Sequence, residues 1–232
     1  MAARRWPGGG AAEAGPDELA SGPMKLTKYE HACVLVEDGS ARVLIDPGAY
    51  SHGFEQLTGL TAILITHQHR DHLDVDRLRP LLERNEGVQL RTDAGSAAIL
   101  AEAGIAAKEV RPGDEFDVGT KVSVHGSQHA VIHPDVPIVP NAGYLIGDRF
   151  FHPGDAFTIP DVDIDVLGLP TGAPWLKASE AVEYLRAVTP NIAIPIHEAV
   201  LAFPKMHFDL FERLAPEETR LTVVEPGTTI EV

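Results

Sequence analysis

Apolar positions along the chain fall into short runs that are separated by turn dipeptides, such as DG at 38–39 and PG at 47–48. Runs of β-branched or alternating apolar residues bounded by such turns are typical of strands. The run TAILIT at 61–66 predicts a buried strand that ends directly before His67. In all, the pattern predicts strands at 25–29, 31–37, 42–46, 61–66, 115–118, 121–125, 143–146, 150–152, 164–167, 192–196 and 220–224.

Other segments have the apolar spacing of helices. Val75, Leu78 and Leu81 share one helical face after the N-cap residue Asp74, and this helix is expected to end before Gly87. Further helices are expected at 94–103, 179–188 and 207–214. Because strands outnumber helices and their order repeats in the two halves of the chain, we expect two packed sheets with helices outside, a layered α/β architecture.

The first 23 residues differ from the rest of the chain. Of them, 14 are Ala, Gly or Pro, and they show no apolar period. Such a segment buries too little apolar surface to offset the entropy of ordering it, so we expect a disordered leader at 1–23. A single folded domain is expected at 24–232, and Met24 is an alternative start of translation.

Composition and charge exclude several classes of protein. Hydrophobic residues make up 44% of the chain, but no apolar run approaches the roughly 20 residues that a membrane helix needs. A net charge of −15 repels nucleic acid and anionic membrane surfaces, which favours a small-molecule partner. Cys33 is the single cysteine, so an internal disulfide is ruled out, and no signal peptide follows Arg4 and Arg5. The single cysteine and the lack of a signal peptide both predict a cytoplasmic protein.

The strongest chemical signal is the segment at 67–72, His-Gln-His-Arg-Asp-His, which lies between a predicted buried strand and a helix cap. Imidazoles and carboxylates are ligands that zinc, manganese and iron prefer, whereas calcium requires oxygen ligands. Asp155 and His197 follow predicted strands further along the chain and can complete such a site. Only one further histidine is needed for a first ion, and the residue pattern leaves three open: His125, His129 and His133.

Taken together, these residues resemble the metallo-β-lactamase superfamily. The matching features, in the order in which the family has them, are Asp46 in LIDPG, the segment at 67–72, His129, Asp155 in HPGD and His197 in PIH. The resemblance covers nearly all of 24–232 and implies a four-layer αββα sandwich of two packed mixed β-sheets with helices on the outer faces. The opening TKYEHACVLVE, which contains His31, is similar to that of the branch with L-ascorbate-6-phosphate lactonase.

The resemblance also implies a role for each matching residue. It implies two divalent metal ions, with zinc expected first and manganese or iron as alternatives. Asp155 would bridge the two ions and Asp46 would be structural, while His125 stays an alternative to His129. The implied ligands are His67, His69 and His129 for the first ion and Asp71, His72 and His197 for the second.

On this resemblance, a hydroxide shared by the two ions attacks an electrophilic carbonyl or phosphorus. Asp71 is expected to be the catalytic residue, which binds the second ion and orients the hydroxide. We expect a metal-dependent hydrolase of a small ester, lactone or phosphoester. Two alternatives stay open: a phosphodiesterase or nuclease that acts on nucleic acid, and a non-catalytic metal-binding protein on the same fold. Contacts to the substrate are expected from His31, His133 and Trp175.

Overall fold

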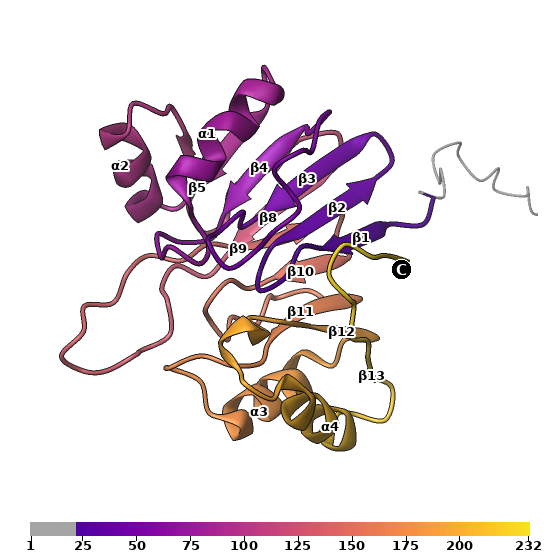
Figure 1. Ribbon diagram of the computed structural model, residues 1–232. Coiled ribbons are helices and arrows are strands. Elements are labelled where there is room, and N and C mark those ends of the chain that lie inside the picture. The colour runs from indigo at the N-terminus through magenta and orange to yellow at the C-terminus, as the bar shows by residue number, and fades with distance from the viewer. Residues whose placement is uncertain (1–21) are drawn as a thin grey trace, which may run out of the picture.

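The computed structural model describes residues 22–232, so the leader expected at 1–23 falls outside the described residues except for its last two positions. Within the described part, two sheets of seven strands each pack face to face, and helices cover both outer faces (Figure 1). This arrangement confirms the predicted four-layer αββα sandwich. Among the described residues, no helix has the length and apolar character that crossing a membrane requires.

The first sheet is an antiparallel meander that is extended by parallel strands. Its strands are β1 Lys25–Lys28, β2 Val34–Asp38, β3 Ala41–Ile45, β4 Ala62–Ile65, β5 Gln89–Thr92, β6 Lys108–Glu109 and β14 Thr229–Glu231. Their order across the sheet is β14-β1-β2-β3-β4-β5-β6. β1, β2 and β3 are antiparallel, β3 through β6 are parallel, and β14 is antiparallel to β1.

The second sheet also combines antiparallel and parallel strands. Its strands are β7 Glu115–Asp117, β8 Lys121–His125, β9 Gly143–Ile146, β10 Phe150–His152, β11 Val166–Pro170, β12 Ile192–Ile196 and β13 Arg220–Leu221. Their order is β13-β12-β11-β10-β9-β8-β7. β7 through β10 are antiparallel and β10 through β13 are parallel, so both sheets are mixed.

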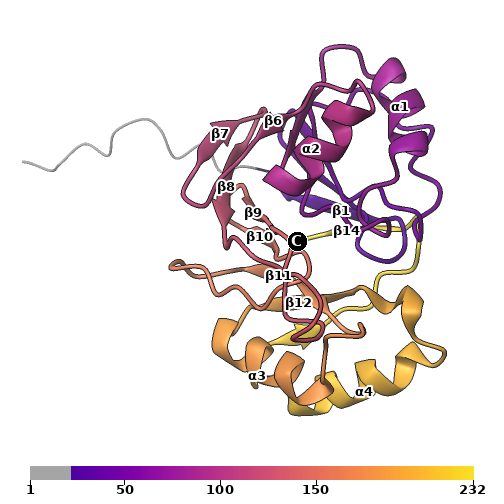
Figure 2. The ribbon, with the colours of Figure 1, turned by 90° about the vertical axis from the view of Figure 1, so that its left-hand side faces the viewer.

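Helices cover the outer face of each sheet in the described part of the chain (Figure 2). They are α1 (Val75–Arg84) and α2 (Ala94–Glu102) on the first sheet and α3 (Ala178–Val188) and α4 (Pro204–Leu214) on the second. Side chains of a strand alternate between two faces, so Val43 packs in the cluster between the sheets and Leu44 in the cluster beneath α1 and α2. A third apolar cluster lies between the second sheet and its helices.

The sequence pattern does not predict β5, β6 or β14, because these strands are short and largely polar and gain their order from pairing at a sheet. The strand expected at 31–37 begins only at Val34, because His31, with φ 43°, lies in a tight turn. The helix expected at 207–214 begins earlier, at Pro204, since the fixed φ of proline suits the first turn of a helix.

Several loops meet along one edge of the sandwich. The segment at 67–72 follows β4, Asp155 follows β10 and His197 follows β12, each at the carboxyl end of a strand that has a parallel neighbour. His31 follows β1, and His129 lies in the long loop between β8 and β9. Because the carboxyl ends of parallel strands meet at one edge of a sheet, residues far apart in sequence come together there.

Candidate metal centre

The loop at 67–72 lies close to the turn that follows β3. A Cβ atom at Gly48 would lie 1.8 Å from the carbonyl oxygen of Asp71, so only glycine permits this approach. The backbone N–H of Ala49 donates to the carbonyl oxygen of Arg70 at 2.9 Å. The loop therefore presents its side chains from a backbone that is held in place by the neighbouring turn.

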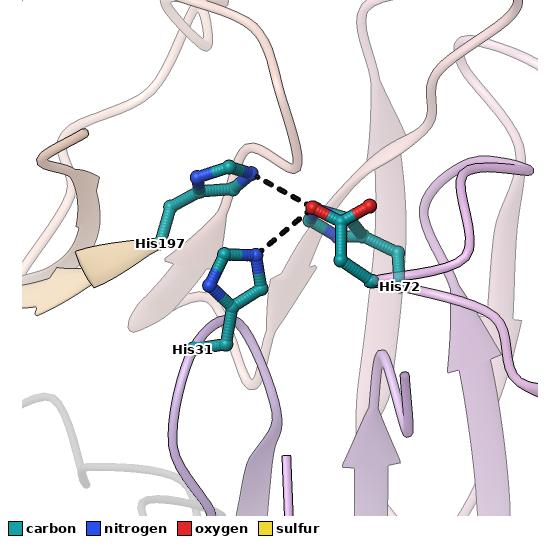
Figure 3. A group of neighbouring side chains, drawn as sticks. His31, His72 and His197 are labelled. Atoms are coloured by element: carbon teal, nitrogen blue, oxygen red, sulfur yellow. Dashed lines mark hydrogen bonds and ion pairs between the residues drawn. The ribbon is translucent and has the colours of Figure 1, made fainter. Parts of the chain in front are cut away.

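Side chains from separate loops form two groups of candidate metal ligands. Within each group, one N or O atom of each residue lies within 4.8 Å of the corresponding atoms of the others. His31, His72 and His197 reach the centre from different loops and face one another (Figure 3). The first group is His67, His69, His129 and Asp155, and the second is His31, Asp71, His72 and His197.

Hydrogen bonds through Nδ1 fix three of the imidazole rings. His72 donates to Asp46 Oδ2 at 2.7 Å, and His129 and His197 each donate to a backbone carbonyl oxygen at 2.5 Å. In the neutral form of each ring the proton stays on Nδ1, so Nε2 has a lone pair that can bind a cation. These Nε2 atoms are buried, form no hydrogen bond with the described residues, and lie 3.0 to 3.3 Å from the Asp155 oxygens. A metal ion is the partner that such atoms fit.

A buried hydrogen-bond network beneath the loop orients His67. The backbone N–H of Thr66 donates to Asp46 Oδ1, and the Thr66 hydroxyl donates to Asp46 Oδ2, both at 2.7 Å. With its proton committed to Asp46, the hydroxyl accepts the Nδ1–H of His67 at 3.1 Å. Asp46 thus holds His72 directly and His67 through Thr66, which is the kind of structural role that the family resemblance implies.

Three residues of the centre have backbone conformations that non-glycine residues seldom adopt. The φ angles are 43° at His31, 50° at Asp46 and 64° at His197, and such strain persists only where the surroundings enforce it. The backbone N–H of His197 donates to the carbonyl oxygen of His31 at 3.1 Å, so the two turns support each other. Both rings then reach Asp71, whose Oδ2 lies 3.0 Å from His31 Nε2 and 3.4 Å from His197 Nε2.

Burial and the carboxylates shift the pKa values of the rings in opposite directions. Burial lowers the pKa of His67 well below its ordinary value, and it lowers the pKa of His31 to about 4. At His72 and His197 burial acts in the same direction, but the neighbouring carboxylates outweigh it, Asp155 with Asp46 at His72 and Asp155 with Asp71 at His197. They raise the pKa of His197 to about 9 and hold the pKa of His72 above its usual range. The centre therefore favours a bound cation, whether proton or metal.

The three residues expected to contact substrate lie in different surroundings. His31 is fully buried and belongs to the second group of candidate ligands. Trp175 is also buried, and its indole N–H donates to Asp155 Oδ2 at 2.9 Å. His133 lies in the exposed loop between β8 and β9, where its side chain is 63% exposed and its Nδ1 accepts from the backbone N–H of Asp135 at 3.1 Å. His133 belongs to neither group.

His129 joins the first group, and His125 does not. His125 ends β8, and its Nε2 lies 2.9 Å from the Ser123 hydroxyl. The ring centre of His129 lies 4.9 Å from that of His67 and 4.7 Å from that of His69. The course of the loop after β8 decides between the two histidines, and spacing in the sequence does not contain this information.

The sequence pattern does not predict the role of Thr66, because Thr66 is the last residue of the apolar run at 61–66. Its position directly before His67 is the one signal that points to it. A hydroxyl next to a candidate ligand is well placed to orient the ligand's ring, and such supporting partners accompany most metal-binding histidines.

Comparison with known proteins assigns the chain to a family. Residues 25–197 match the family model described as the Beta-lactamase superfamily domain, and the chain belongs to this superfamily. It is 51% identical over 185 residues to Protein Rv0786c of Mycobacterium tuberculosis, with 77% of this chain and 86% of the relative covered. It is 28% identical over 205 residues to the UPF0173 metal-dependent hydrolase MJ1163 of Methanocaldococcus jannaschii, with 81% and 89% covered.

Solved structures share the fold at low sequence identity. Igni18, a metallo hydrolase of Ignicoccus hospitalis, superposes with a TM-score of 0.69 at 20% identity, covering 90% of this chain and 98% of its own. The metallo-beta-lactamase fold protein YhfI of Bacillus subtilis has a TM-score of 0.68 at 13% identity, covering 90% and 100%. The family match and these structures confirm the resemblance drawn from the motifs.

Proposed function

We propose that the protein is a metal-dependent hydrolase that binds two divalent ions, one in each group of candidate ligands. The observation that supports this best is the set of buried Nε2 atoms on His72, His129 and His197, which are oriented through Nδ1 and form no hydrogen bond with the described residues. Imidazole and carboxylate donors suit zinc, with manganese or iron as alternatives. The similar hydrolase from M. jannaschii supports the same class of activity.

In this proposal Asp155 is shared between the two ions. Its Oδ1 lies 3.1 Å from His72 Nε2, while its Oδ2 lies 3.3 Å from His129 Nε2 and 3.0 Å from His197 Nε2. The carboxylate therefore reaches both groups, as a bridging ligand must. The remaining ligands are His67, His69 and His129 for the first ion and Asp71, His72 and His197 for the second.

Bound divalent ions would supply Lewis acidity and a water nucleophile near neutral pH. The chain supplies the proton acceptor. The Asp71 side chain is 19% exposed, so it is accessible from the solvent. His31 donates its Nε2–H to Asp71 Oδ2 and positions the carboxylate. Burial alone would raise the pKa of Asp71, but the adjacent His197 ring and the hydrogen bond from His31 lower it below the ordinary value, which keeps Asp71 ionised.

We further propose that the substrate is a small ester, lactone or phosphoester and that the protein acts in the cytoplasm. The net charge of −15 opposes binding of a long polyanion. Cys33, the single cysteine, is buried and unpaired, which suits a reducing compartment. A phosphodiesterase or nuclease, and a non-catalytic metal-binding protein, are the alternatives that an experiment must separate.

Elemental analysis of protein purified without chelator tests the metal part of the proposal. We expect close to two ions per chain, and we expect chelation to abolish hydrolysis and to lower Tm, because a ligand that binds only the folded state stabilises it. Zinc or manganese added back should restore both properties. A stoichiometry of one or less that persists after reconstitution would refute the two-ion site.

A substrate panel tests the reaction. We would compare p-nitrophenyl esters, aliphatic lactones, phosphomonoesters, bis(p-nitrophenyl) phosphate and single-stranded DNA under identical metal loading. Turnover of the small esters, lactones or phosphomonoesters supports the proposal. Turnover of the phosphodiester and DNA alone would favour the nuclease alternative, and two bound ions without turnover of any substrate would favour the non-catalytic one.

A further inference from the structure

A cavity of about 440 Å³ lies beside the metal centre, in the range of about 300–1,000 Å³ that is usual for small-molecule sites. It is formed where the long loop between β8 and β9 meets the segment before α3, and both segments lie on the same side of the molecule (Figure 1). The larger apolar residues of its lining are Val131, Ile132, Phe157, Pro174, Trp175 and Leu176.

Two residues of the lining connect the cavity to the candidate ligands. Trp175 donates its indole N–H to Asp155 Oδ2 at 2.9 Å, and its ring centre lies 5.8 Å from that of His129. Ala130 also belongs to the lining, and its backbone N–H donates to the carbonyl oxygen of Asp155 at 2.8 Å, while its own carbonyl accepts from His129. A group bound in the cavity therefore contacts residues that are hydrogen-bonded directly to candidate metal ligands.

The cavity offers apolar surface and no net charge. Lys177 and Glu180 are the charged residues of the lining; their side chains are largely exposed, and 3.3 Å separates Lys177 Nζ from Glu180 Oε1. Val131 is 55% exposed and Ile132 is 37% exposed, so apolar side chains remain in contact with water at this place. An uncharged apolar group would remove this surface from water, whereas a lining whose two charges are opposite in sign offers an anionic group no net attraction.

We propose that this cavity holds an uncharged apolar chain of the substrate, attached to the ester, lactone or phosphoester group that reacts at the metal centre. This inference rests on the proposed function and deepens it by naming the kind of group that the substrate carries beside its reacting group. The indole of Trp175 has two roles: its N–H positions Asp155, and its ring forms part of the wall against which the chain packs.

Fluorescence of Trp175 tests the cavity without any need for turnover. The chain has two tryptophans, so Trp6→Phe leaves Trp175 as the single indole reporter. We would titrate the metal-loaded Trp6→Phe protein with 1-butanol, 1-hexanol and 1-octanol. We expect a saturable change in fluorescence with a Kd that falls about fourfold for each added methylene group. The absence of a saturable change, or a Kd independent of chain length, would overturn the proposal.

A matched pair of variants locates the binding. Val131→Ser removes apolar surface from the lining, and Val223→Ser changes a valine of similar exposure (48%) that does not line the cavity. In the Trp6→Phe background, we expect Val131→Ser to weaken 1-octanol binding about threefold or more and Val223→Ser to leave it unchanged. Equal effects of the two substitutions would show that the alcohols bind elsewhere and would overturn the proposal.

An ester series separates this inference from the proposed function. With p-nitrophenyl acetate, butyrate, hexanoate and octanoate, we expect kcat/KM to rise with chain length in parallel with alcohol affinity, and the rise to flatten in Val131→Ser. Length-dependent alcohol binding with no hydrolysis of any ester, lactone or phosphoester would refute the proposed function and leave the binding cavity standing. Hydrolysis with a flat dependence on chain length would refute the cavity and leave the hydrolase standing.

Discussion

Asp71→Asn is the sharpest test of the metal centre. The substitution keeps the volume of the side chain and removes its negative charge. Asp71 is the single carboxylate of the second group, in which the other members are His31, His72 and His197. The fold should persist, because the Asp71 side chain belongs to none of the three apolar clusters.

The expected magnitude follows from the charge that is lost. At an effective dielectric constant of about 20, two unit charges about 4 Å apart interact by about 4 kcal/mol, and each 1.4 kcal/mol or so corresponds to tenfold in affinity. Because the amide oxygen of asparagine can still bind a metal ion weakly, we expect the affinity for the second ion to fall by a factor of about 10² or more. We expect kcat to fall by at least about 10²-fold as well, since Asp71 is also the proposed proton acceptor.

The assay combines metal content with turnover. After exhaustive dialysis against metal-free buffer, Asp71→Asn should retain about one ion, because the first group of ligands is intact. Asp74→Asn is the matched control: Asp74 accepts from the backbone N–H groups of Asp76 and Arg77 at 3.1 and 3.3 Å, and asparagine caps a helix about as well as aspartate. Asp74→Asn should therefore keep two ions, wild-type kcat and nearly wild-type Tm.

Two outcomes would contradict the role assigned to Asp71. If Asp71→Asn keeps two ions at wild-type affinity, Asp71 is not a ligand of the second ion. If it loses the second ion but turns over at close to the wild-type rate, catalysis does not need that ion or the carboxylate. Metal titration alone tests whether Asp71 binds the second ion, and this test needs no substrate.

Three further predictions test the surroundings of the centre and the start of the domain. Thr66→Val removes the hydroxyl that accepts from His67 Nδ1, so metal affinity measured with a competing chromophoric chelator should fall about 10- to 100-fold; unchanged affinity would contradict the role of the hydroxyl. Gly48→Ala would push against the carbonyl oxygen of Asp71, so metal content should drop and Tm should fall; full metal content would show that the turn adapts freely. Deletion of 1–23 should change neither Tm nor turnover, and a loss of several degrees would show that this segment packs on the domain.

Local patterns in the sequence were enough for most of the fold and for part of the centre. The apolar run at 61–66 predicted a buried strand, and β4 occupies Ala62–Ile65. Asp74 was expected to cap a helix, and it is the N-cap of α1. The histidines and aspartate at 67–72 were recognisable because they stand together in the chain. Each of these features depends on neighbours within a few positions, which is the range over which periodicity and capping act.

Pairing with distant strands decided the remaining elements. β5, β6 and β14 have little apolar pattern of their own, and each is held by hydrogen bonds to a neighbouring strand. The residues of such a strand, taken by themselves, do not indicate which strand it pairs with. The strand order of the two sheets is likewise a long-range property, and the sequence pattern did not predict it.

Tertiary structure alone decided which side chains converge on the metal centre. His31 follows the first strand, yet it lies against Asp71 and His197 because its backbone turn, with φ 43°, is held by the hydrogen bond from the His197 backbone. The direction of the loop after β8 brought His129 into the first group and left His125 outside it. Sequence determined which donors are available, through their chemistry and local spacing. The packing of loops at one edge of the sandwich determined their partners, because side-chain direction there depends on contacts between residues far apart in the chain.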